Sequence, residues 1–347
     1  MFRQITRTGT WPKQWRTEYG TPLQKITNPV DEDDLRIISL TNYFSKQYEH
    51  FVILWLLKYV GSQLDCAQYG GVKGSSISHY LINFINFILY NQDLAVPQAV
   101  VAVMVDFSKA FNRINHNTII TILSEMGVPG WLLRIVIGFL TDRELILRHK
   151  GGSSGRKSMP GGGPQGTKLG LFLFLILINA VGYPNLEKNL GQKITEKVGR
   201  RSPIPNIHMK YVDDLSLAQS INLKQCVVPN PNPTHPLNFH DRTNHILPST
   251  TYTLQDDLNK LAFFSKNHQM VINTNKCKVM MFHTGRKVDA LPQLTIPGMG
   301  GDNLEVVESF KLLGVKLRSG VDYICKGGIL DYGCLGGLKH LVPQKRS

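Results

Sequence analysis

The fold of this chain is decided by two short stretches, Val-Ala-Val-Met-Val-Asp at 101–106 and Tyr-Val-Asp-Asp at 211–214. The five apolar residues before Asp106 predict a β-strand that is buried on both faces. Apolar residues alternate with polar ones on both sides of Asp213 and Asp214, which predicts a hairpin with a tight two-residue turn at the acidic pair. We therefore expect three carboxylates at one edge of two adjacent strands.

Carboxylates held this close repel one another by several kcal/mol at a protein-like dielectric, so they need a compensating charge. Magnesium prefers oxygen ligands and keeps phosphate and water in its shell. The sequence therefore predicts that Asp106, Asp213 and Asp214 bind two Mg²⁺ ions, with Mn²⁺ as a substitute, for nucleotidyl transfer. An Asp-Asp pair taken alone is also typical of a solvated turn.

A glycine-rich stretch, Met159-Pro160-Gly161-Gly162-Gly163-Pro164-Gln165-Gly166-Thr167, lies between the acidic motifs and is followed by an apolar run over 169–178. Glycines let the backbone approach a nucleotide, and a helix behind the loop would support it. A flexible linker into a core helix is the alternative for this segment in isolation.

Taken in order, these motifs and others resemble those of the reverse transcriptases of non-LTR (LINE-type) retrotransposons. The resemblance covers about 11 to 317, in the blocks Leu35–Leu40, Gln68–Ser76, Asp106–Phe111, Gly163–Thr167, Tyr211–Asp214, Asn273–Lys278 and Phe310–Val315. Any one block could arise by chance, but the whole series in this order very rarely would.

The resemblance implies an α+β fold, a right-hand polymerase with fingers, a palm with a split βαβ core, and a truncated thumb. The expected segments are an N-terminal extension over 1–26, fingers over 27–97, the palm with the nucleotidyl-transfer site over 98–285, a primer-grip-like hairpin over 286–318, and a truncated thumb or disordered tail over 319–347.

The hydrophobic pattern adds expected elements inside these segments. We expect strands at 101–105 and 208–218, helices around 117–126, 130–140, 168–180 and 254–268, and surface loops over 184–206 and 226–249.

The resemblance also implies catalytic roles. Asp106, Asp213 and Asp214 match the metal-binding acids of the palm. Lys276 matches a lysine proposed in related polymerases to protonate the pyrophosphate leaving group, with a solvated surface lysine as the alternative. Phe111 matches the aromatic residue that stacks under the incoming sugar and screens against a 2′-hydroxyl group, with an ordinary core aromatic as the alternative.

Further residues are expected to bind substrates. Gln165 and Gly166 match residues beside the incoming nucleotide. Arg36 matches a fingers arginine that binds triphosphate, for which a planar bidentate donor is suited. Lys73 lies in a Gly-Ser loop like those along the template path. Gly314 lies in a hairpin that resembles the primer grip, where glycine allows close approach of the primer backbone.

We therefore expect an RNA-directed DNA polymerase, a nucleotidyltransferase that extends a DNA primer on an RNA template with deoxynucleoside triphosphates. One alternative is a catalytically inactive, nucleic-acid-binding remnant of such an element. Another is an RNA-dependent RNA polymerase, against which Phe111 argues. Because the glycine-rich end looks eroded and no endonuclease motif is present, we expect a truncated copy of an element.

Composition agrees with a nucleic-acid partner. The chain has 39 Lys+Arg against 25 Asp+Glu, a net charge of +14, which favours a polyanionic ligand. No secretory signal is evident and the apolar run near 169–181 is too short for a membrane span. Scattered cysteines without a CxxC pair predict reduced thiols. We expect an intracellular protein, in the nucleus, the cytoplasm or both, with no membrane partner; the sequence leaves its oligomeric state open.

Overall fold

The structure is a computed structural model that describes residues 1–31, 34–96, 98–108, 110–164, 166–181, 204–222, 254–283, 293–298 and 303–319. The chain folds into two compact units, each built from separate stretches. The helical unit comprises Met1–Gly71, Phe107–Gly182 and Phe263–Val271; the sheet unit comprises Val72–Asp106, Tyr183–Ala262 and Ile272–Ser347. The contiguous segments expected from the sequence stay a proposal.

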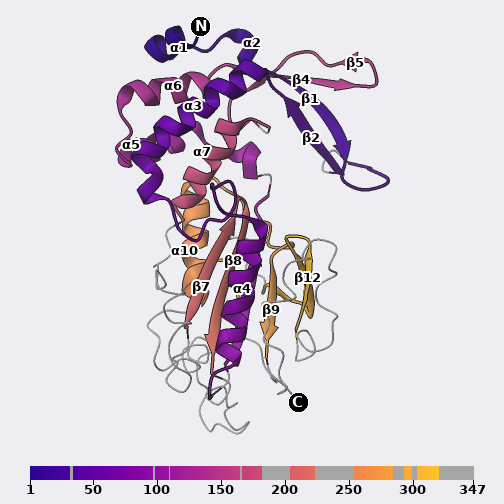
Figure 1. Cartoon of the computed structure of the whole chain (residues 1–347). Helices are drawn as coiled ribbons and strands as arrows, with labels where there is room; N and C mark the ends of the chain where they lie inside the picture. Colours follow the sequence, from indigo (N-terminus) through magenta and orange to yellow (C-terminus); the bar gives the residue numbers. More distant parts are fainter. Residues whose placement is uncertain are drawn as a thin grey trace. The chain divides into compact units, whose positions relative to one another are not determined.

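The helical unit is a bundle packed around one apolar helix (Figure 1). Its helices are α1 (Phe2–Thr8), α2 (Lys13–Arg16), α3 (Tyr43–Val60), η2 (Gly61–Gln63), η3 (Ala110–Arg113), α5 (His116–Glu125), α6 (Gly130–Leu140) and α7 (Lys168–Asn179). α3 and α5 both pack against α7 and against α6. Residues on all sides of α7 are buried, as expected for a helix enclosed by others.

Aromatic residues fill the core where the N-terminus meets α6. Trp11 is 1% exposed, and its indole Nε1 donates a hydrogen bond to the carbonyl of Ile135 at 2.9 Å. Its ring contacts those of Trp15, Tyr48 and Phe139. Because a buried indole N–H needs an acceptor, this bond fixes the N-terminal segment on α6.

A β-ribbon extends the helical unit. Its strands are β1 (Thr17–Gln24), β2 (Leu35–Leu40), β4 (Arg143–His149), β5 (Gly152–Ser153) and β6 (Lys157–Met159), with β1 between β2 and β4. A buried ion pair ties β1 to β4, because Arg143 donates from Nε and Nη2 to Glu18 Oε1 at 2.9 and 2.7 Å. These strands were not predicted from the sequence.

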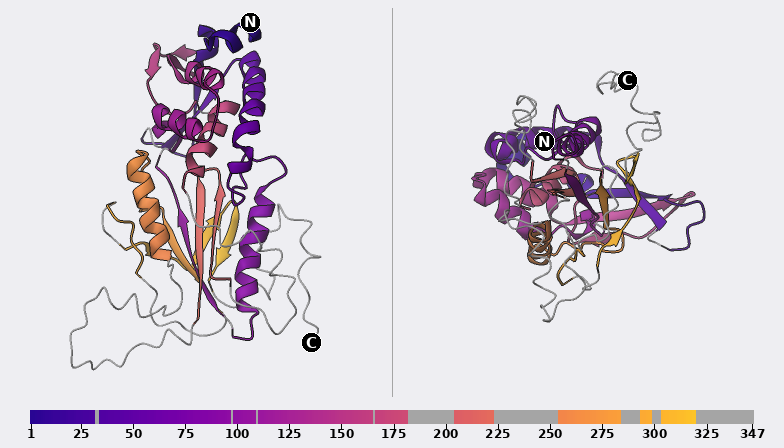
Figure 2. Two further views of the ribbon diagram at one scale, coloured as in Figure 1. Left: turned by 90° about the vertical axis from the view of Figure 1, so that its left-hand side faces the viewer. Right: turned by 90° about the horizontal axis from the view of Figure 1, so that it is seen from below.

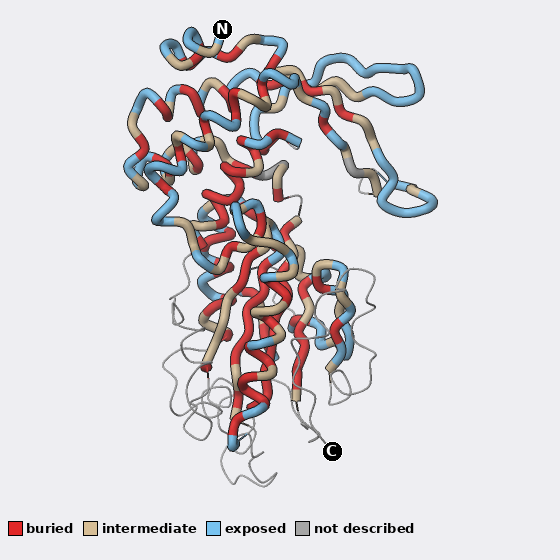
Figure 3. Tube along the Cα trace, viewed as in Figure 1, coloured by how far each residue is buried: buried red, intermediate tan, exposed pale blue. Residues whose placement is uncertain are grey.

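The sheet unit is built on the order β10-β9-β3-β8-β7. The strands are β3 (Ala99–Val105), β7 (Asn206–Tyr211), β8 (Asp214–Ile221), β9 (Lys278–Phe282) and β10 (Glu305–Val306). Buried residues predominate along the strands of this sheet (Figure 3). β3 is antiparallel to both β8 and β9, and every one of its residues is buried. This confirms the strand that the apolar run before Asp106 predicts.

Helices cover both faces of this sheet. α4 (Ile77–Gln92) lies on one face, and the turns of α10 (Leu254–Asn267) that belong to the sheet unit lie on the other (Figure 2). Tyr80 of α4 contacts the ring of Tyr211, and Phe84 contacts that of Phe282. The mixed order of strands and helices confirms the expected α+β class.

A separate hairpin pairs β11 (Ser309–Leu312) with β12 (Val315–Arg318). Its two turn residues, Leu313 and Gly314, both have positive φ, as a type I′ turn requires. This is the short hairpin that the sequence places in the primer-grip-like segment.

The four predicted helices are found as α5, α6, α7 and α10, with bounds within two residues of those expected. The loop expected over 184–206 lies outside the described residues except for its last three, and β7 already begins at Asn206. The loop over 226–249 and the thumb after 319 lie outside the described residues. No described helix is both long enough and apolar enough to span a bilayer.

Candidate active site

Acidic residues lie at the meeting ends of two neighbouring strands of the sheet unit. Asp106 follows the last residue of β3, and Asp214 is the first residue of β8. Because these strands are antiparallel with Val105 opposite Leu215, the same register carried one step further places Asp106 opposite Asp214. Adjacent antiparallel strands therefore deliver the acids to one end of the sheet.

The turn between β7 and β8 differs from the predicted one. Tyr211 pairs with Asp214, so the two turn residues are Val212 and Asp213, and the predicted turn at Asp213 and Asp214 is wrong by one residue. Val212 has a φ of 59°, a value that β-branched residues rarely adopt. Sequence reasoning missed this turn because glycine usually occupies such a position.

The carboxylates influence one another electrostatically. Burial, followed by the charges of Asp213 and Asp106, raises the pKa of Asp214 to about 6. Asp214 still exposes part of its surface, so this desolvation is partial. Burial also raises the pKa of Asp106, while the nearby charge of Lys276 lowers it. The charges of Asp213 and Asp106 thus disfavour the ionised form of Asp214, because like charges repel.

Lys276 joins this cluster from the turn before β9. Its Nζ lies 4.0 Å from Asp106 Oδ2, and both side chains are exposed to solvent. The β3–β9 ladder ends where Met104 pairs with Lys278, and Lys276 lies two residues before that pair. The tight turn before β9 is tied to the site because the Asn273 amide donates to the Asp106 carbonyl at 2.8 Å.

Cys277 was missed as a site residue. Its Sγ accepts a hydrogen bond from the Asp106 amide at 3.5 Å, and burial raises the pKa of its thiol to about 11. The sulfur therefore supports the backbone of Asp106 as a neutral thiol. The only signal in the sequence was its position directly after Lys276. Cys66 and Cys277 are both free thiols.

Over the part of the chain that the structure describes, no group of three or more His, Cys, Asp or Glu residues is arranged to hold a metal ion. The chemistry of the donor set nonetheless fits a divalent cation. Asp106, Asp213 and Asp214 offer hard carboxylate oxygens whose mutual repulsion a cation would relieve.

The glycine-rich loop is fastened within the helical unit. The amides of Gly162 and Gly163 donate to the carbonyls of Ile114 and Phe111 at 2.9 and 2.6 Å. Gly166 has a φ of 103°, and a Cβ there would lie 2.5 Å from a backbone oxygen, that of Ser39 on β2. Only glycine fits this close approach. Gln165 lies outside the described residues.

The remaining predicted residues lie on several elements. Phe111 is half-buried and stacks on Phe174 of α7 with ring centroids 4.5 Å apart. Arg36 pairs with Leu23 in the β1–β2 register. Lys73 is exposed in the turn before α4.

Gly314 lies in the β11–β12 turn with open space at its Cβ position. The structure therefore gathers Asp106, Asp214 and Lys276 at one end of the sheet, with Asp213 in the adjoining turn. It leaves Phe111, Gly166 and Arg36 in the helical unit.

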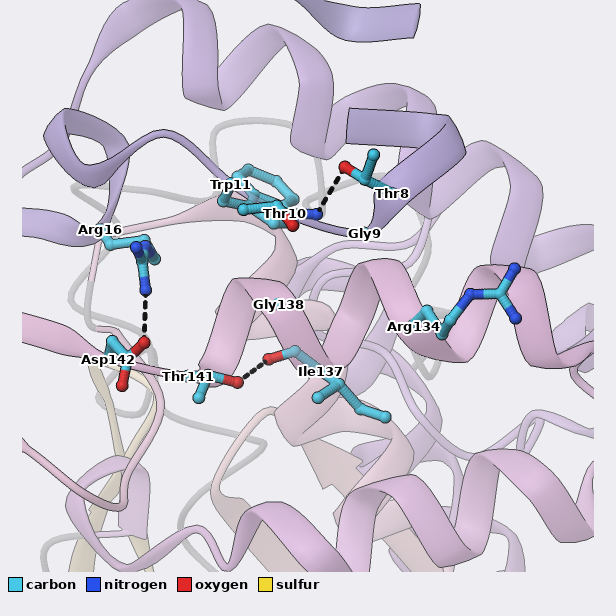
Figure 4. A pocket seen from close by; sticks show the side chains of 10 residues that line it. All are labelled: Thr8, Gly9, Thr10, Trp11, Arg16, Arg134, Ile137, Gly138, Thr141 and Asp142. Carbon is cyan, nitrogen blue, oxygen red and sulfur yellow. Dashed lines mark hydrogen bonds and ion pairs between the residues drawn. The ribbon is translucent and has the colours of Figure 1, made fainter. Parts of the chain in front are cut away.

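A cavity of about 320 Å³ lies elsewhere in the helical unit, near the turn after α1 and the end of α6 (Figure 4). Arg16 points across it toward Asp142, with which it forms an ion pair at 2.8 Å, while Arg134 points away from that pair. None of the predicted site residues lines it. The predicted site residues therefore lie outside this cavity.

Comparison of the sequence with models of known protein families gives a match. The family described as "Reverse transcriptase (RNA-dependent DNA polymerase)" matches residues 25–317, which is most of the chain. The chain therefore belongs to the reverse transcriptase family, whose members use divalent metal ions and share the right-hand polymerase fold.

Two curated relatives come from mobile elements of Drosophila melanogaster. The probable RNA-directed DNA polymerase from transposon BS is 24% identical over 225 residues, covering 64% of this chain and 23% of the relative. The RNA-directed DNA polymerase from mobile element jockey is 26% identical over 179 residues, covering 51% and 19%. The resemblance to non-LTR retrotransposon enzymes is thereby confirmed. The chain spans less than a quarter of the length of these relatives.

Among solved structures, apo telomerase from Candida tropicalis, truncated from its C-terminal domain, has a TM-score of 0.48 and 12% identity, covering 91% of this chain and 57% of that one. Candida albicans telomerase with a fragment of telomeric RNA has a TM-score of 0.45 and 11% identity, covering 91% and 47%.

Proposed function

We propose that this chain is an RNA-directed DNA polymerase domain, which extends a DNA primer on an RNA template with deoxynucleoside triphosphates. The observation that carries the proposal is the convergence of Asp106, Asp214 and Lys276 at one end of adjacent strands, with Asp213 in the turn. Such a set suits a reaction in which the protein mainly positions groups and stabilises charge.

In this proposal Asp106, Asp213 and Asp214 hold two divalent ions, Mg²⁺ with Mn²⁺ as a substitute. When bound, the ions supply acidification of the primer 3′-hydroxyl and neutralisation of the charge on pyrophosphate. Lys276 carries a proton beside Asp106 and donates it to the leaving group. Cys277 holds the Asp106 backbone in place.

The substrates are proposed to be bound by other residues. Arg36 binds the triphosphate, and Gly166 with Gln165 brings backbone close to the incoming nucleotide. Phe111 lies under the sugar. Lys73 and Gly314 contact template and primer.

We further propose that 27–97 forms the fingers, 98–285 the palm and 286–318 the primer grip, flanked by an N-terminal extension over 1–26 and a shortened thumb over 319–347. The protein then works inside the cell, in the nucleus or the cytoplasm.

The test is extension of a DNA primer on an RNA template in Mg²⁺, comparing wild type with Asp106→Asn and Asp213→Asn. Both variants keep side-chain size and lose charge, so we expect extension to fall by more than about 10³-fold, a loss of about 4 kcal/mol of transition-state stabilisation. Asp142→Asn, an exposed acid of the helical unit, is the matched control and should extend normally. Equal extension by wild type and Asp106→Asn would refute the site.

The same assay separates the rival functions. A wild type that binds RNA–DNA duplex at low salt yet never extends it is the inactive remnant. An RNA polymerase would incorporate ribonucleotides in preference to deoxynucleotides. If Phe111 screens against the 2′-hydroxyl, Phe111→Ala should raise ribonucleotide incorporation, whereas a purely core role predicts lower stability with unchanged sugar preference.

A further inference from the structure

A buried carboxylate lies behind the glycine-rich loop. Glu49 of α3 is 0% exposed. Its Oε2 accepts hydrogen bonds from the amides of Lys168 and Leu169 at 2.8 and 3.1 Å, and its Oε1 accepts one from Ser45 Oγ at 2.9 Å. A buried carboxylate is costly unless it is bonded in this way. The positive end of a helix dipole stabilises it further, and Glu49 faces the N-terminus of α7.

The amides that Glu49 binds are the first two of α7, directly after the loop Gly163–Thr167. That helix start already has a cap of its own, because Thr167 Oγ1 accepts from the Gly170 amide and donates to the Pro164 carbonyl. Glu49 is therefore not needed merely to begin the helix. What it adds is a tie between a separate helix, α3, and the end of the loop.

The other side of the loop is equally constrained. Its first residue, Gly163, donates its amide to the Phe111 carbonyl, and the preceding Gly162 donates to that of Ile114. Gly166 lies against the Ser39 carbonyl near the end of β2. β2 is followed within three residues by α3, which carries Glu49. Gly166 thus lies between two fixed points. One is Ser39 near the end of β2, and the other is the first turn of α7, whose amides donate to Glu49.

We propose that Glu49 is a positioning residue for the nucleotide-binding loop Gly163–Thr167. By fixing the first turn of α7 relative to β2, it sets where the backbone of Gly166 meets the incoming deoxynucleoside triphosphate. The inference rests on the proposed function of this loop.

The test compares Glu49→Gln and Glu49→Ala with wild type. Glu49→Gln keeps the size and one acceptor oxygen but loses the charge, and Glu49→Ala loses both acceptors. We expect the KM for deoxynucleoside triphosphates to rise about tenfold in Glu49→Ala and less in Glu49→Gln, the range of a hydrogen bond to a charged group. The affinity for template–primer should change by less than about twofold, since that contact lies elsewhere.

The matched control is Asn42→Ala. Asn42 also accepts from two backbone amides, those of Phe44 and Ser45, but both belong to α3 itself and neither to the loop. It should lower the melting temperature and leave KM unchanged. If Glu49→Ala behaves in the same way, Glu49 is only structural and the proposal is overturned. Should both Glu49 variants fail to fold, Ser45→Ala removes one partner of Glu49 and is expected to show a smaller KM rise.

Amide hydrogen exchange over 160–170 provides a readout that needs no activity. Loss of Glu49 should speed exchange in this segment, and Asn42→Ala should not. An inactive wild type would refute the proposed function alone, because exchange still decides whether Glu49 fixes the loop. Unchanged exchange in Glu49→Ala would overturn the positioning role even in an active enzyme.

Discussion

Val212 holds a positive φ of 59° in the turn that carries Asp213. Such a conformation costs a β-branched residue about 1–3 kcal/mol. Glycine adopts it freely but loses about 0.5–1 kcal/mol of backbone entropy. We therefore expect Val212→Gly to stabilise the protein by up to about 1–2 kcal/mol in urea unfolding.

Val212→Ala is the control for this prediction, because it removes the branch and keeps the Cβ atom. Its stability should fall between those of wild type and Val212→Gly. A glycine variant less stable than wild type would show that the valine side chain contributes more stability than the strained backbone removes. In that case the turn is relaxed.

Burial, and after it the like charges of Asp213 and Asp106, disfavour the ionised form of Asp214 without a cation. Asp214→Asn removes one of these charges and should stabilise the metal-free protein by up to about 1 kcal/mol, since the group is partly exposed and solvent screens it. A ligand that binds only the folded state raises its stability. Adding Mg²⁺ should therefore raise the melting temperature of wild type more than that of Asp214→Asn. If the melting temperatures of wild type and Asp214→Asn change equally when Mg²⁺ is added and when EDTA removes it, a metal site at Asp214 is contradicted.

His268 gives a pH dependence in the helical unit. Burial lowers its pKa from the ordinary value of 6.5, and the charge of Glu125 opposes this only in part. The unfolded chain then takes up the proton first as pH falls, so stability contributed at neutral pH is lost below about 6.5. Urea unfolding between pH 7.5 and 5 should show this loss, and His268→Gln should reduce it. A parallel loss in both proteins would assign the acid sensitivity to other groups.

At the scale of helices and strands, the spacing of hydrophobic residues along the sequence decided which elements could be predicted. α5, α6 and α7 have continuous apolar patterns and were predicted closely. The β1–β2–β4 ribbon was not, because its stability comes from contacts distant in sequence. Gly20 leaves room for Ile37, Leu145 and Leu147 on one face, and the Glu18–Arg143 pair buries two charges that a sequence pattern assigns to the surface.

The contact between α6 and the turn after α1 depends on one glycine. A Cβ at Gly138 would clash with the carbonyl oxygen of Gly9, a backbone atom that cannot move away cheaply. Gly138→Ala should therefore destabilise the protein by about 2 kcal/mol or more despite the better helix propensity of alanine. Thermal or urea unfolding measures this.

Gly130 at the start of the same helix is the matched control. Nothing lies within 4 Å of its Cβ position, so Gly130→Ala should be neutral or slightly stabilising. If both variants lose the same stability, helix α6 itself and not its close contact with Gly9 explains the effect.

At the scale of the whole molecule, the acids and the lysine that lie together were easier to find in the sequence than the residues that bond to their surroundings. The acids are recognisable because they stand at the ends of apolar, strand-like runs. Glu49 and Cys277 act through burial and backbone hydrogen bonds, which are set by tertiary packing and leave little pattern in one sequence. Their roles became visible only once the strands and helices that surround them were placed.

The charge of the whole chain leads to the last prediction. A net charge of +14 implies nucleic-acid binding that weakens with salt, with a slope of about −0.7 per phosphate contact for single strands. Three cations are exposed on strands β4 and β6 of the β-ribbon and in the turn after β4, namely Arg148, Lys150 and Lys157. The Arg148 guanidinium lies 3.8 Å from the centre of the Tyr19 ring. Replacing these three cations by serine should weaken RNA binding and flatten the slope by about 2.

The control replaces three exposed cations on other surfaces of the helical unit, Arg3, Arg7 and Lys58, by serine, which also lowers the net charge from +14 to +11. If the ribbon contacts the phosphates directly, only its variant should change the slope, because counterions are released where phosphates are neutralised. The measurement is an RNA titration from 50 to 300 mM salt. An equal loss of RNA affinity in both variants would instead show that the overall positive charge of the chain drives binding. Asp213→Asn should bind with an unchanged or slightly higher affinity in either case, since removing an acid does not cost a phosphate contact.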